Sequence, residues 1–258
     1  MTRILAVANQ KGGVGKTTTS VNLAAGLAGS GKRVLLIDLD PQGNATMGSG
    51  IDKRNLQSSV YQVLLGLTTV QSVRHTSESG GYDLVPANRD LAGAEVEMVE
   101  LDNRETRLKS ALSAIAGEYD YIILDCPPAL NLLTLNGLVA AESVIIPMQC
   151  EYYALEGLSD LVETIRKVRK HLNPRLEIEG LLRTMYDPRN SLTQQVSAQL
   201  QQHFGDKLYA TIIPRNVRLA EAPSYGAPAV NLDKACKGSQ AYVALAEEVL
   251  SRASVAIA

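Results

Sequence analysis

The sequence predicts an α/β fold, with one domain over residues 1–258 built on a mostly parallel, twisted sheet that has helices on both faces. Short apolar runs alternate with segments of helical period along the chain, as in doubly wound proteins. Several runs are continuously apolar, which is typical of strands buried on both faces. The 258 residues are 45% apolar, enough for one large core, and no linker, repeat or low-complexity segment divides the chain.

The apolar runs and the segments of helical period predict the strands and helices in chain order. The apolar runs predict strands at residues 4–8, 34–37, 82–85, 121–124, 144–148, 178–184 and 210–213. The segments between them predict helices at residues 17–28, 88–99, 104–116, 132–140, 155–171, 192–204 and 240–251. The first helix should end at Gly29-Ser30-Gly31, because glycine accepts the left-handed conformation of a helix C-cap. Residues 43–60 and 68–80, rich in Gly, Ser and Thr, should be the least regular parts.

Segment 9–18, Asn-Gln-Lys-Gly-Gly-Val-Gly-Lys-Thr-Thr, follows the first strand and opens the first helix. A glycine-rich turn in this position exposes backbone N–H groups that can cradle a phosphate, and the helix dipole adds positive potential. We expect Lys16 to reach the β- and γ-phosphates and the Thr17 hydroxyl to bind Mg²⁺. The predicted nucleotide-binding residues of this loop are Lys11, Gly12, Gly13, Val14, Gly15, Lys16, Thr17 and Thr18.

One position departs from the common pattern G-x-x-x-x-G-K-[ST]. Gln10 stands where the first glycine is expected, and a second lysine, Lys11, follows it. The strand before the loop and the helix after it still predict a nucleotide-binding site.

Two further strand ends carry carboxylates. Residues 36–44 read Leu-Ile-Asp-Leu-Asp-Pro-Gln-Gly-Asn, and strand alternation would place Asp38 and Asp40 on one side of the chain. Residues 121–128 read Tyr-Ile-Ile-Leu-Asp-Cys-Pro-Pro and have the Walker B form, an apolar strand that ends in an acid, here Asp125. Because the carboxyl ends of parallel strands meet at one edge of a sheet, these segments predict one site for a nucleotide and Mg²⁺.

Net charge, the length of the apolar runs and the spacing of the cysteines exclude several classes of protein. The formal net charge is −2, so nucleic acid would have to bind a local patch. No apolar run approaches the roughly 20 residues of a membrane span, and the chain leads directly into its first strand, so neither a membrane helix nor a signal peptide is expected. Cys126, Cys150 and Cys236 have neither metal-binding nor disulfide spacing, which predicts free thiols and a cytoplasmic protein.

Together the motifs resemble those of a known family. Segment 11–18 resembles the deviant Walker A motif, whose first lysine is its hallmark, and segments 38–44 and 124–128 resemble the family's second and third motifs. The segments Cys-Glu-Tyr-Tyr-Ala-Leu-Glu-Gly at 150–157 and Ile-Pro-Arg-Asn-Val-Arg-Leu-Ala-Glu-Ala-Pro at 213–223 extend the match. From about residue 3 to residue 250 the chain resembles the small ParA-type (Soj-like) partition ATPases.

The resemblance implies an ATP- and Mg²⁺-dependent switch. Two ATP-bound chains would form a homodimer across their phosphate loops, with Lys11 of each chain at the nucleotide of the other and Gly12 at the closest approach. The catalytic residues would be Lys11, Lys16 and Asp40, with Asp40 orienting the attacking water. Slow intrinsic hydrolysis of ATP is expected, since such switches await a stimulator.

The same resemblance assigns the remaining site residues. Thr17, Asp38 and Asp125 would lie in the Mg²⁺ shell. Met185 and Pro214 would line the adenine pocket.

Binding of double-stranded DNA without sequence preference is a further implication. Arg189 and Arg218 match the family's DNA-contacting positions, and Lys234 and Lys237 are candidates to add to them. The expected partner is a ParB-type centromere-binding protein, whose basic, disordered N-terminal segment stimulates hydrolysis in the family. The protein would then be nucleoid-associated. The basic cluster at 166–170 is expected to be a solvated helix face.

Three other interpretations remain open. A MinD-like ATPase would use the same dimer switch to position membrane or protein cargo, but its C-terminal helix should be basic on one face and bulky-apolar on the other. Residues 251–258 carry one basic side chain and no aromatic one. An iron–sulfur carrier built on this loop needs paired cysteines or C-x-x-C spacing, which the chain lacks. A small-molecule kinase or synthetase needs an acceptor pocket that no motif identifies.

Overall fold

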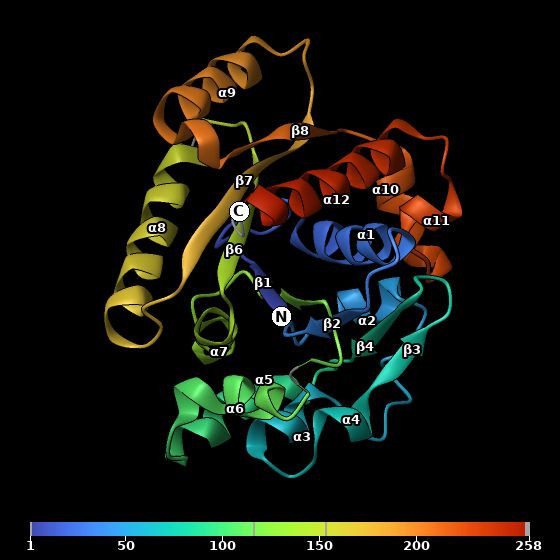
Figure 1. Ribbon diagram of the computed structural model, residues 1–258, viewed down its shortest axis with the longest axis vertical. Coiled ribbons are helices and arrows are strands. Elements are labelled where there is room, and N and C mark those ends of the chain that lie inside the picture. Colours follow the sequence, from blue (N-terminus) through green and yellow to red (C-terminus); the bar gives the residue numbers. More distant parts are fainter. Residues whose placement is uncertain (1, 116, 153, 256–258) are drawn as a thin grey trace.

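The sheet has eight strands in the order β3-β4-β2-β5-β1-β6-β7-β8 (Figure 1). All neighbouring strands are parallel except β3 and β4. The computed structural model describes residues 2–115, 117–152 and 154–255. The predicted α/β class with a mostly parallel sheet is confirmed.

The seven predicted strands are all present. The strands are β1 (Arg3–Val7), β2 (Val34–Asp38), β3 (His75–Ser77), β4 (Tyr82–Val85), β5 (Tyr121–Asp125), β6 (Ser143–Gln149), β7 (Glu177–Tyr186) and β8 (Leu208–Pro214). Sequence analysis missed β3, which pairs antiparallel with β4 at the edge of the sheet. His75 and Thr76 are exposed there, so no apolar run marks this short strand.

Helices cover both faces of the sheet (Figure 1). One face carries α1 (Lys16–Gly29), α2 (Asn44–Gly48), α10 (Val217–Glu221), α11 (Ala229–Leu232) and α12 (Lys237–Val255). The other face carries α3 (Val60–Leu65), α4 (Val70–Val73), α5 (Leu91–Glu97), α6 (Arg107–Ser113), α7 (Leu132–Ala140), α8 (Ala154–His171) and α9 (Ser191–Phe204). Four 3-10 helices connect them: η1 (Met98–Glu100), η2 (Arg104–Thr106), η3 (Gly205–Lys207) and η4 (Ala222–Tyr225).

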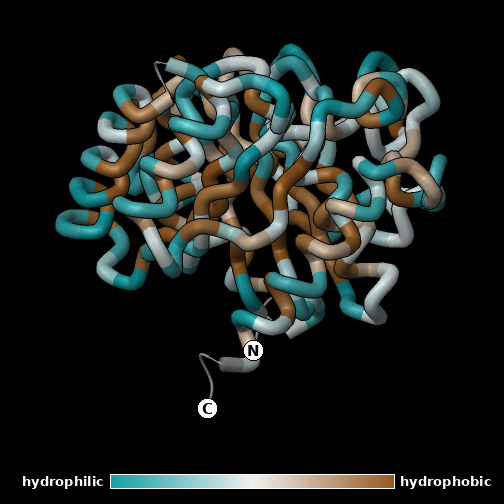
Figure 2. Tube along the Cα trace, turned by 90° about the horizontal axis from the view of Figure 1, so that it is seen from above, coloured by the Kyte–Doolittle hydropathy of each residue, from teal (hydrophilic) through white to brown (hydrophobic). Residues whose placement is uncertain are grey.

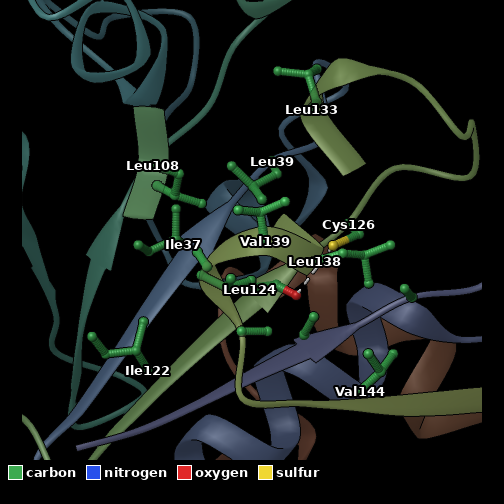
Figure 3. Packing of buried hydrophobic residues seen from close by; sticks show 14 of the residues in the cluster. Ile37, Leu39, Leu108, Ile122, Leu124, Cys126, Leu133, Leu138, Val139 and Val144 are labelled. Carbon is green, nitrogen blue, oxygen red and sulfur yellow. Dashed lines mark hydrogen bonds between the residues drawn. The ribbon is translucent and has the colours of Figure 1, made fainter. Parts of the chain in front are cut away.

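Alternate side chains of the inner strands enter two separate cores. Ile122 and Leu124 of β5 belong to the same cluster as Ile37, Leu39 and the buried residues of α7 (Figure 3). Ile123, between them in β5, belongs to the cluster that α1 and α12 complete. Along the chain trace the hydrophobic residues concentrate in the interior and the hydrophilic residues at the periphery (Figure 2). Burial on both faces explains why these strands are continuously apolar in the sequence.

The long helices largely follow their predicted bounds, and α7 coincides with the prediction at 132–140. The helix predicted at 88–99 begins later, at Leu91, and ends in η1. The helix predicted at 104–116 divides into η2 and α6, and its last predicted residue, Ala116, lies outside the described residues. So do Tyr153 of the 150–157 motif and the last three residues of the C-terminal segment 251–258. Gly31, after α1, has the expected left-handed φ of +77°.

Besides β3, several short helices have no counterpart among the predicted elements. Within 43–60, 68–80 and the flanking positions the chain forms α2, α3 and α4, and between β8 and α12 it forms α10 and α11. Each has four to six residues, too few to establish a helical period.

Candidate functional site

Residues 9–15 form a loop between the carboxyl end of β1 and the first turn of α1. Gly13 and Gly15 have φ of +73° and +87°, a conformation that glycine adopts at no steric cost. Two side chains from neighbouring elements fix the loop. Asn9 Nδ2 donates to the carbonyl of Pro147 in β6, and Thr184 Oγ1 of β7 donates to the carbonyl of Val14, each at 2.8 Å. The loop is therefore preformed.

Lys16 begins α1, and its side chain lies inside the loop. Nζ donates to the carbonyl of Lys11 at 3.0 Å, and the residue is only 8% exposed. Burial lowers the pKa of Lys16, while the carboxylates of Asp125 and Asp40 oppose that shift. In the described part of the chain, no side chain caps the N-terminus of α1. A buried ammonium beside uncapped helix N–H groups makes a site for a phosphate.

Asp125, the last residue of β5, is level with Asp38 of β2 and with Val7 of β1 in the strand register. Ser20 Oγ of α1 donates to Asp125 Oδ1 at 2.8 Å, whereas the buried Oδ2 has no hydrogen-bond partner among the described residues. Burial and then the charge of Asp38 raise the pKa of Asp125, and the Ser20 and Thr17 hydroxyls oppose that rise. A cation at Oδ2 would complete this site, so Asp125 and Thr17 fit Mg²⁺.

A magnesium ion here would not need a cage of protein ligands. Among the described residues, no three His, Cys, Asp or Glu side chains gather in a way that could hold a metal. Mg²⁺ in nucleotide sites usually keeps several waters and takes one or two protein carboxylates together with phosphate oxygens.

Asp38 makes contacts of a different kind. Its Oδ1 accepts from the backbone N–H of Asp40 at 3.1 Å, and its Oδ2 accepts from the N–H and the hydroxyl of Thr46, each at 2.8 Å. β2 ends at Asp38, but the N–H of Leu39 still donates to the carbonyl of Asp125 at 3.0 Å, and Leu39 lies in the same core as Ile37, as the expected alternation requires. Asp40 is half-buried, and its Oδ1 accepts from the N–H of Gln42 at 2.9 Å. Asp38 thus shapes the loop that presents Asp40, and its place in a Mg²⁺ shell stays a prediction.

A pocket of about 350 Å³ opens beside the phosphate loop. Met185 and Pro214, the predicted adenine-pocket residues, both line it, together with Gly15 and Tyr242. Met185 has φ of +49°, a rare value for a residue other than glycine, and such outliers cluster at ligand sites. The structure therefore brings Met185 and Pro214 to one cavity next to the phosphate loop, of a size that small ligands use.

Lys11 and Gly12 lie at the outer edge of the loop. Lys11 Nζ is 2.6 Å from Glu151 Oε2, and the two side chains are 42% and 51% exposed. A Cβ placed on Gly12 would meet no atom of the described residues within 4 Å. Both residues are accessible to a second molecule that approaches this edge.

The predicted DNA-contacting residue Arg189 lies in the loop after β7. Its side chain is 88% exposed and pairs with Asp187 at 2.8 Å. The N–H of Arg215, after β8, donates to the carbonyl of Tyr186 at 3.3 Å, so the loops after β7 and β8 adjoin.

Arg218, Lys234 and Lys237 form one group at the same edge. Arg218 of α10 pairs with Glu221 at 3.0 Å and with Asp233 at 3.4 Å. Asp233 directly precedes Lys234, and Lys237 begins α12. Both lysines are exposed. The structure thus brings these three basic residues together, with carboxylates among them.

Comparison with known proteins places the chain in a family. A family model described as an AAA domain matches residues 2–178. An uncharacterized protein of Pseudomonas putida is 62% identical over 98% of this chain and 96% of its own length. The sporulation initiation inhibitor protein Soj of Bacillus subtilis is 55% identical, covering 96% of this chain and 98% of Soj. The chromosome partitioning protein ParA of Caulobacter vibrioides is 53% identical, covering 97% and 94%. The chain belongs to the ParA/Soj family.

Solved structures support the fold of this ParA/Soj chain. Cobyrinic acid a,c-diamide synthase from Mycobacterium smegmatis, with bound ADP and magnesium, has a TM-score of 0.86 at 42% identity and covers 97% of this chain and 94% of its own. The septum site-determining protein MinD from Pyrococcus horikoshii, complexed with Mg-ADP, has a TM-score of 0.82 at 26% identity and covers 99% and 98%. Both hold the combination of adenine nucleotide and magnesium that the sequence of the ParA/Soj chain predicts.

Sequence reasoning missed several residues that build the ParA/Soj site. Ser20, which orients Asp125, lies one helical turn after Lys16, and helical spacing alone could have indicated it. Thr46 and Thr184 lie in other segments of the chain, and no sequence motif around either residue indicates its contact with the site. Tyr242 lines the pocket beside the phosphate loop, and its hydroxyl lies 3.0 Å from the hydroxyl of Thr19, which joins α12 to α1.

Proposed function

We propose that this chain is a Mg²⁺-dependent ATPase that works as a dimerising switch in DNA partitioning. The observation that carries the proposal is the buried Oδ2 of Asp125, which accepts no hydrogen bond within the described part of the chain, on a carboxylate that interacts with Thr17 and Lys16. An uncompensated carboxylate oxygen is costly in a buried site, and a cation removes that cost. Membership of the ParA/Soj family supports the same chemistry.

Hydrolysis of ATP relies on positioning and on charge. When bound, Mg²⁺ would neutralise part of the negative charge of the phosphates. Lys16 and the uncapped N–H groups of α1 bind the phosphates and stabilise the negative charge that develops on them. Asp40, on the loop held by Asp38, orients the attacking water. Turnover is slow until a partner stimulates it.

Dimerisation depends on the nucleotide. Lys11 leaves Glu151 and neutralises the phosphates bound to the other chain, while Gly12 permits close approach of the two loops. Without nucleotide, the lysines of two facing loops repel each other. ATP therefore shifts the population toward the dimer, and hydrolysis releases it.

The ATP-bound dimer binds duplex DNA without sequence preference. Arg218, Lys234 and Lys237, with Arg189 on the adjoining loop, supply contacts to phosphates, and symmetry doubles them. A ParB-type centromere-binding protein stimulates hydrolysis and resets the switch on the nucleoid. The names of the ParA and Soj relatives support this role.

The test is binding to random-sequence duplex DNA with ATP, ADP or no nucleotide over a salt series. Wild type should bind only with ATP, and affinity should fall steeply with salt. Arg218→Glu should lose at least about tenfold in affinity. Lys109→Glu, a charge reversal at an exposed position on α6 of the opposite sheet face, should bind like wild type. ATP-dependent dimerisation without any DNA binding would reject the DNA role.

Anionic liposomes serve as the second arm and distinguish the MinD-like alternative. No helix in the described part of the chain is both long and apolar enough to cross a membrane. Arg252, the basic residue in the last turn of α12, is engaged with Glu248 at 2.8 Å and stacks over the Tyr209 ring at 4.2 Å. We therefore expect no ATP-dependent binding to the liposomes.

A further inference from the structure

A second pocket, of about 330 Å³, lies between α3, α4 and α6. We call it the α6 pocket. Its lining comes from α3 and the turn after it, from the start of α4, and from residues 103–114. Figure 1 shows these three helices together at one end of the molecule, apart from α1 and α12. The α6 pocket shares no lining residue with the pocket beside the phosphate loop, so the proposed ATPase makes no use of it.

Arg107, the first residue of α6, lines this pocket and is half-buried. Its Nε donates to the carbonyl of Leu64 at 2.9 Å, near the C-terminus of α3. A Cβ on Gly66, the residue that caps α3, would lie 2.5 Å from Arg107 Nη2, so glycine leaves the room that the guanidinium occupies. Within the described residues, neither Nη atom of Arg107 donates to a protein acceptor. The N–H groups on both Nη atoms therefore remain available to a ligand.

Neutral polar side chains surround the guanidinium. Thr68, Asn103 and Ser110 line the same pocket, and no side-chain hydrogen bond engages any of the three in the part of the chain that the structure describes. Their hydroxyl and amide groups can donate to an oxygen anion. Asn103 has φ of +56°, and Met185 is the other described residue besides glycine with a positive φ. Each of these two residues lines a pocket, and backbone outliers of this kind cluster at ligand sites.

The positive charge of Arg107 has no carboxylate partner. No acidic residue lines the α6 pocket among the described residues. Glu105, on the neighbouring turn, pairs with Arg104 at 3.0 Å. Glu118, after α6, pairs with Arg74 at 3.2 Å. The chemistry that complements the pocket is therefore anionic.

We propose that the α6 pocket binds a small organic anion, with its carboxylate or phosphate group on Arg107 and a compact apolar body against Val63 and Val70. These two valines line the pocket and are buried, so they supply an apolar surface beside the charge. Arginine can donate two parallel N–H groups to such an oxygen anion, which fixes its orientation. The volume lies at the lower end of the range that small ligands use, which favours a compact molecule.

A bound anion would join elements that are otherwise held by few polar contacts. Arg107 Nε already links α6 to the end of α3. An oxygen anion on the Nη atoms would extend this link to Thr68 in the turn before α4 and to Ser110 in α6. Because the ligand binds the folded protein, we expect it to raise the melting temperature.

The test uses the full protein saturated with Mg-ADP, so that the phosphate loop is occupied. The anions are phenyl phosphate and benzoate, which distinguish a phosphate ligand from a carboxylate ligand, and benzyl alcohol is the neutral control. Binding is measured by calorimetry, and the amide chemical shifts of Thr68 and Ser110 locate it. We expect a Kd of about 0.1–1 mM for at least one of the two anions. Benzyl alcohol should bind at least about tenfold more weakly.

Variants identify the residues that recognise the anion. Arg107→Gln should weaken binding at least about tenfold, because it removes the charge and the paired donors. Ser110→Leu, at an exposed position, should weaken binding by a similar factor because the larger side chain fills the pocket. Lys109→Gln is the matched control: it removes an exposed positive charge of α6 outside the lining and should bind within about twofold of wild type. Since Arg107 also holds Leu64, Ser110→Leu keeps the proposal testable if Arg107→Gln does not fold.

Three results would overturn the proposal. The first is no binding of either anion at about 10 mM. The second is an equal loss in Lys109→Gln and Arg107→Gln, which would assign the effect to net charge. The third is equal affinity for benzyl alcohol, which would mean an apolar depression without anion recognition. Each of them leaves the proposed ATPase standing, because Mg-ADP fills that site throughout, and a failure of ATP hydrolysis would leave the α6 pocket standing.

Discussion

Lys11 and Glu151 form an ion pair within one chain, with 2.6 Å between Nζ and Oε2. Lys16, five residues later, instead donates to the backbone of its own loop. The two lysines of one loop thus have different partners. Since the Lys11–Glu151 pair is 42% and 51% exposed, solvent screens it and it contributes at most about 1 kcal/mol. The proposed displacement of Glu151 by a nucleotide on a second chain would therefore cost little.

Lys11→Ala should separate nucleotide binding from dimerisation. We expect the affinity for a fluorescent ATP analogue to stay within about threefold of wild type, because Lys16 and not Lys11 lies inside the loop. ATP-dependent dimerisation, measured by sedimentation, should weaken by at least about tenfold. Lys16→Ala is the control and should lose both properties. If Lys11→Ala dimerises like wild type, its proposed place at the other chain's nucleotide is wrong.

Asp125→Asn should make the nucleotide-free protein more stable at pH 7 and less responsive to Mg-ADP. The pKa of Asp125 is raised by burial and by Asp38, so its ionisation in the folded state costs stability as the pH rises above the unfolded pKa. The gain in melting temperature should therefore shrink between pH 7 and pH 5. Wild type should gain melting temperature with Mg-ADP and the variant should gain little. An equal gain in both proteins would contradict a metal site at Asp125.

Gly26→Ala should destabilise the packing of α1 on α12. A Cβ at Gly26 would lie 2.9 Å from the Cβ of Ala246, so a backbone or side chain must shift. We expect a loss of about 1–3 kcal/mol in the free energy of unfolding, measured with urea. Gly29→Ala is the matched control, because no atom of the residues that the structure describes lies within 4 Å of its Cβ position and the helix propensity of alanine is higher. Adding Ala246→Gly to Gly26→Ala should restore part of the loss, and no restoration would argue against this contact as the cause.

Asp233→Asn should strengthen DNA binding if Arg218 contacts phosphates. The Asp233 carboxylate lies 3.4 Å from Arg218, and asparagine keeps an oxygen for the N–H of Cys236, which Asp233 Oδ1 accepts at 3.2 Å. We expect affinity for duplex DNA to rise by about two- to fivefold with ATP, with a steeper salt dependence. Asp206→Asn, in η3, should change nothing. Weaker binding by Asp233→Asn would mean that the ion pair positions Arg218 rather than competing for it.

The convergence of segments 9–18, 36–44 and 121–128 could be predicted because parallel strands direct their carboxyl ends to one edge. In the sheet, Asp125 is paired with Asp38 on one side and with Val7 on the other, so the three strands end at the same level. Met185 and Pro214 were assigned by resemblance alone, and the structure places both at one pocket. Their meeting depends on the ends of β7 and β8, which local sequence does not specify.

Other features depend on contacts between distant segments and have no local pattern. Thr46 binds Asp38 only because α2 returns to the end of β2. Glu151 meets Lys11 only because β6 is a neighbour of β1 in the sheet. The side chain of Asp38 accepts a hydrogen bond from the N–H of Asp40, a local contact that the apolar pattern of β2 does not indicate.

The close packing of α1 on α12 also bears on how the chain is made. The helix that begins with Lys16 is covered by a helix that begins at Lys237. During translation the apolar face of α1 that packs on α12 therefore stays exposed until α12 has left the ribosome. In the same way, β1 has no neighbouring strand until β5 and β6 have been synthesised. An interrupted or incompletely synthesised chain would consequently present the phosphate loop on an unsupported helix. Such a fragment should depend on chaperones for solubility rather than compete with the finished protein for ATP.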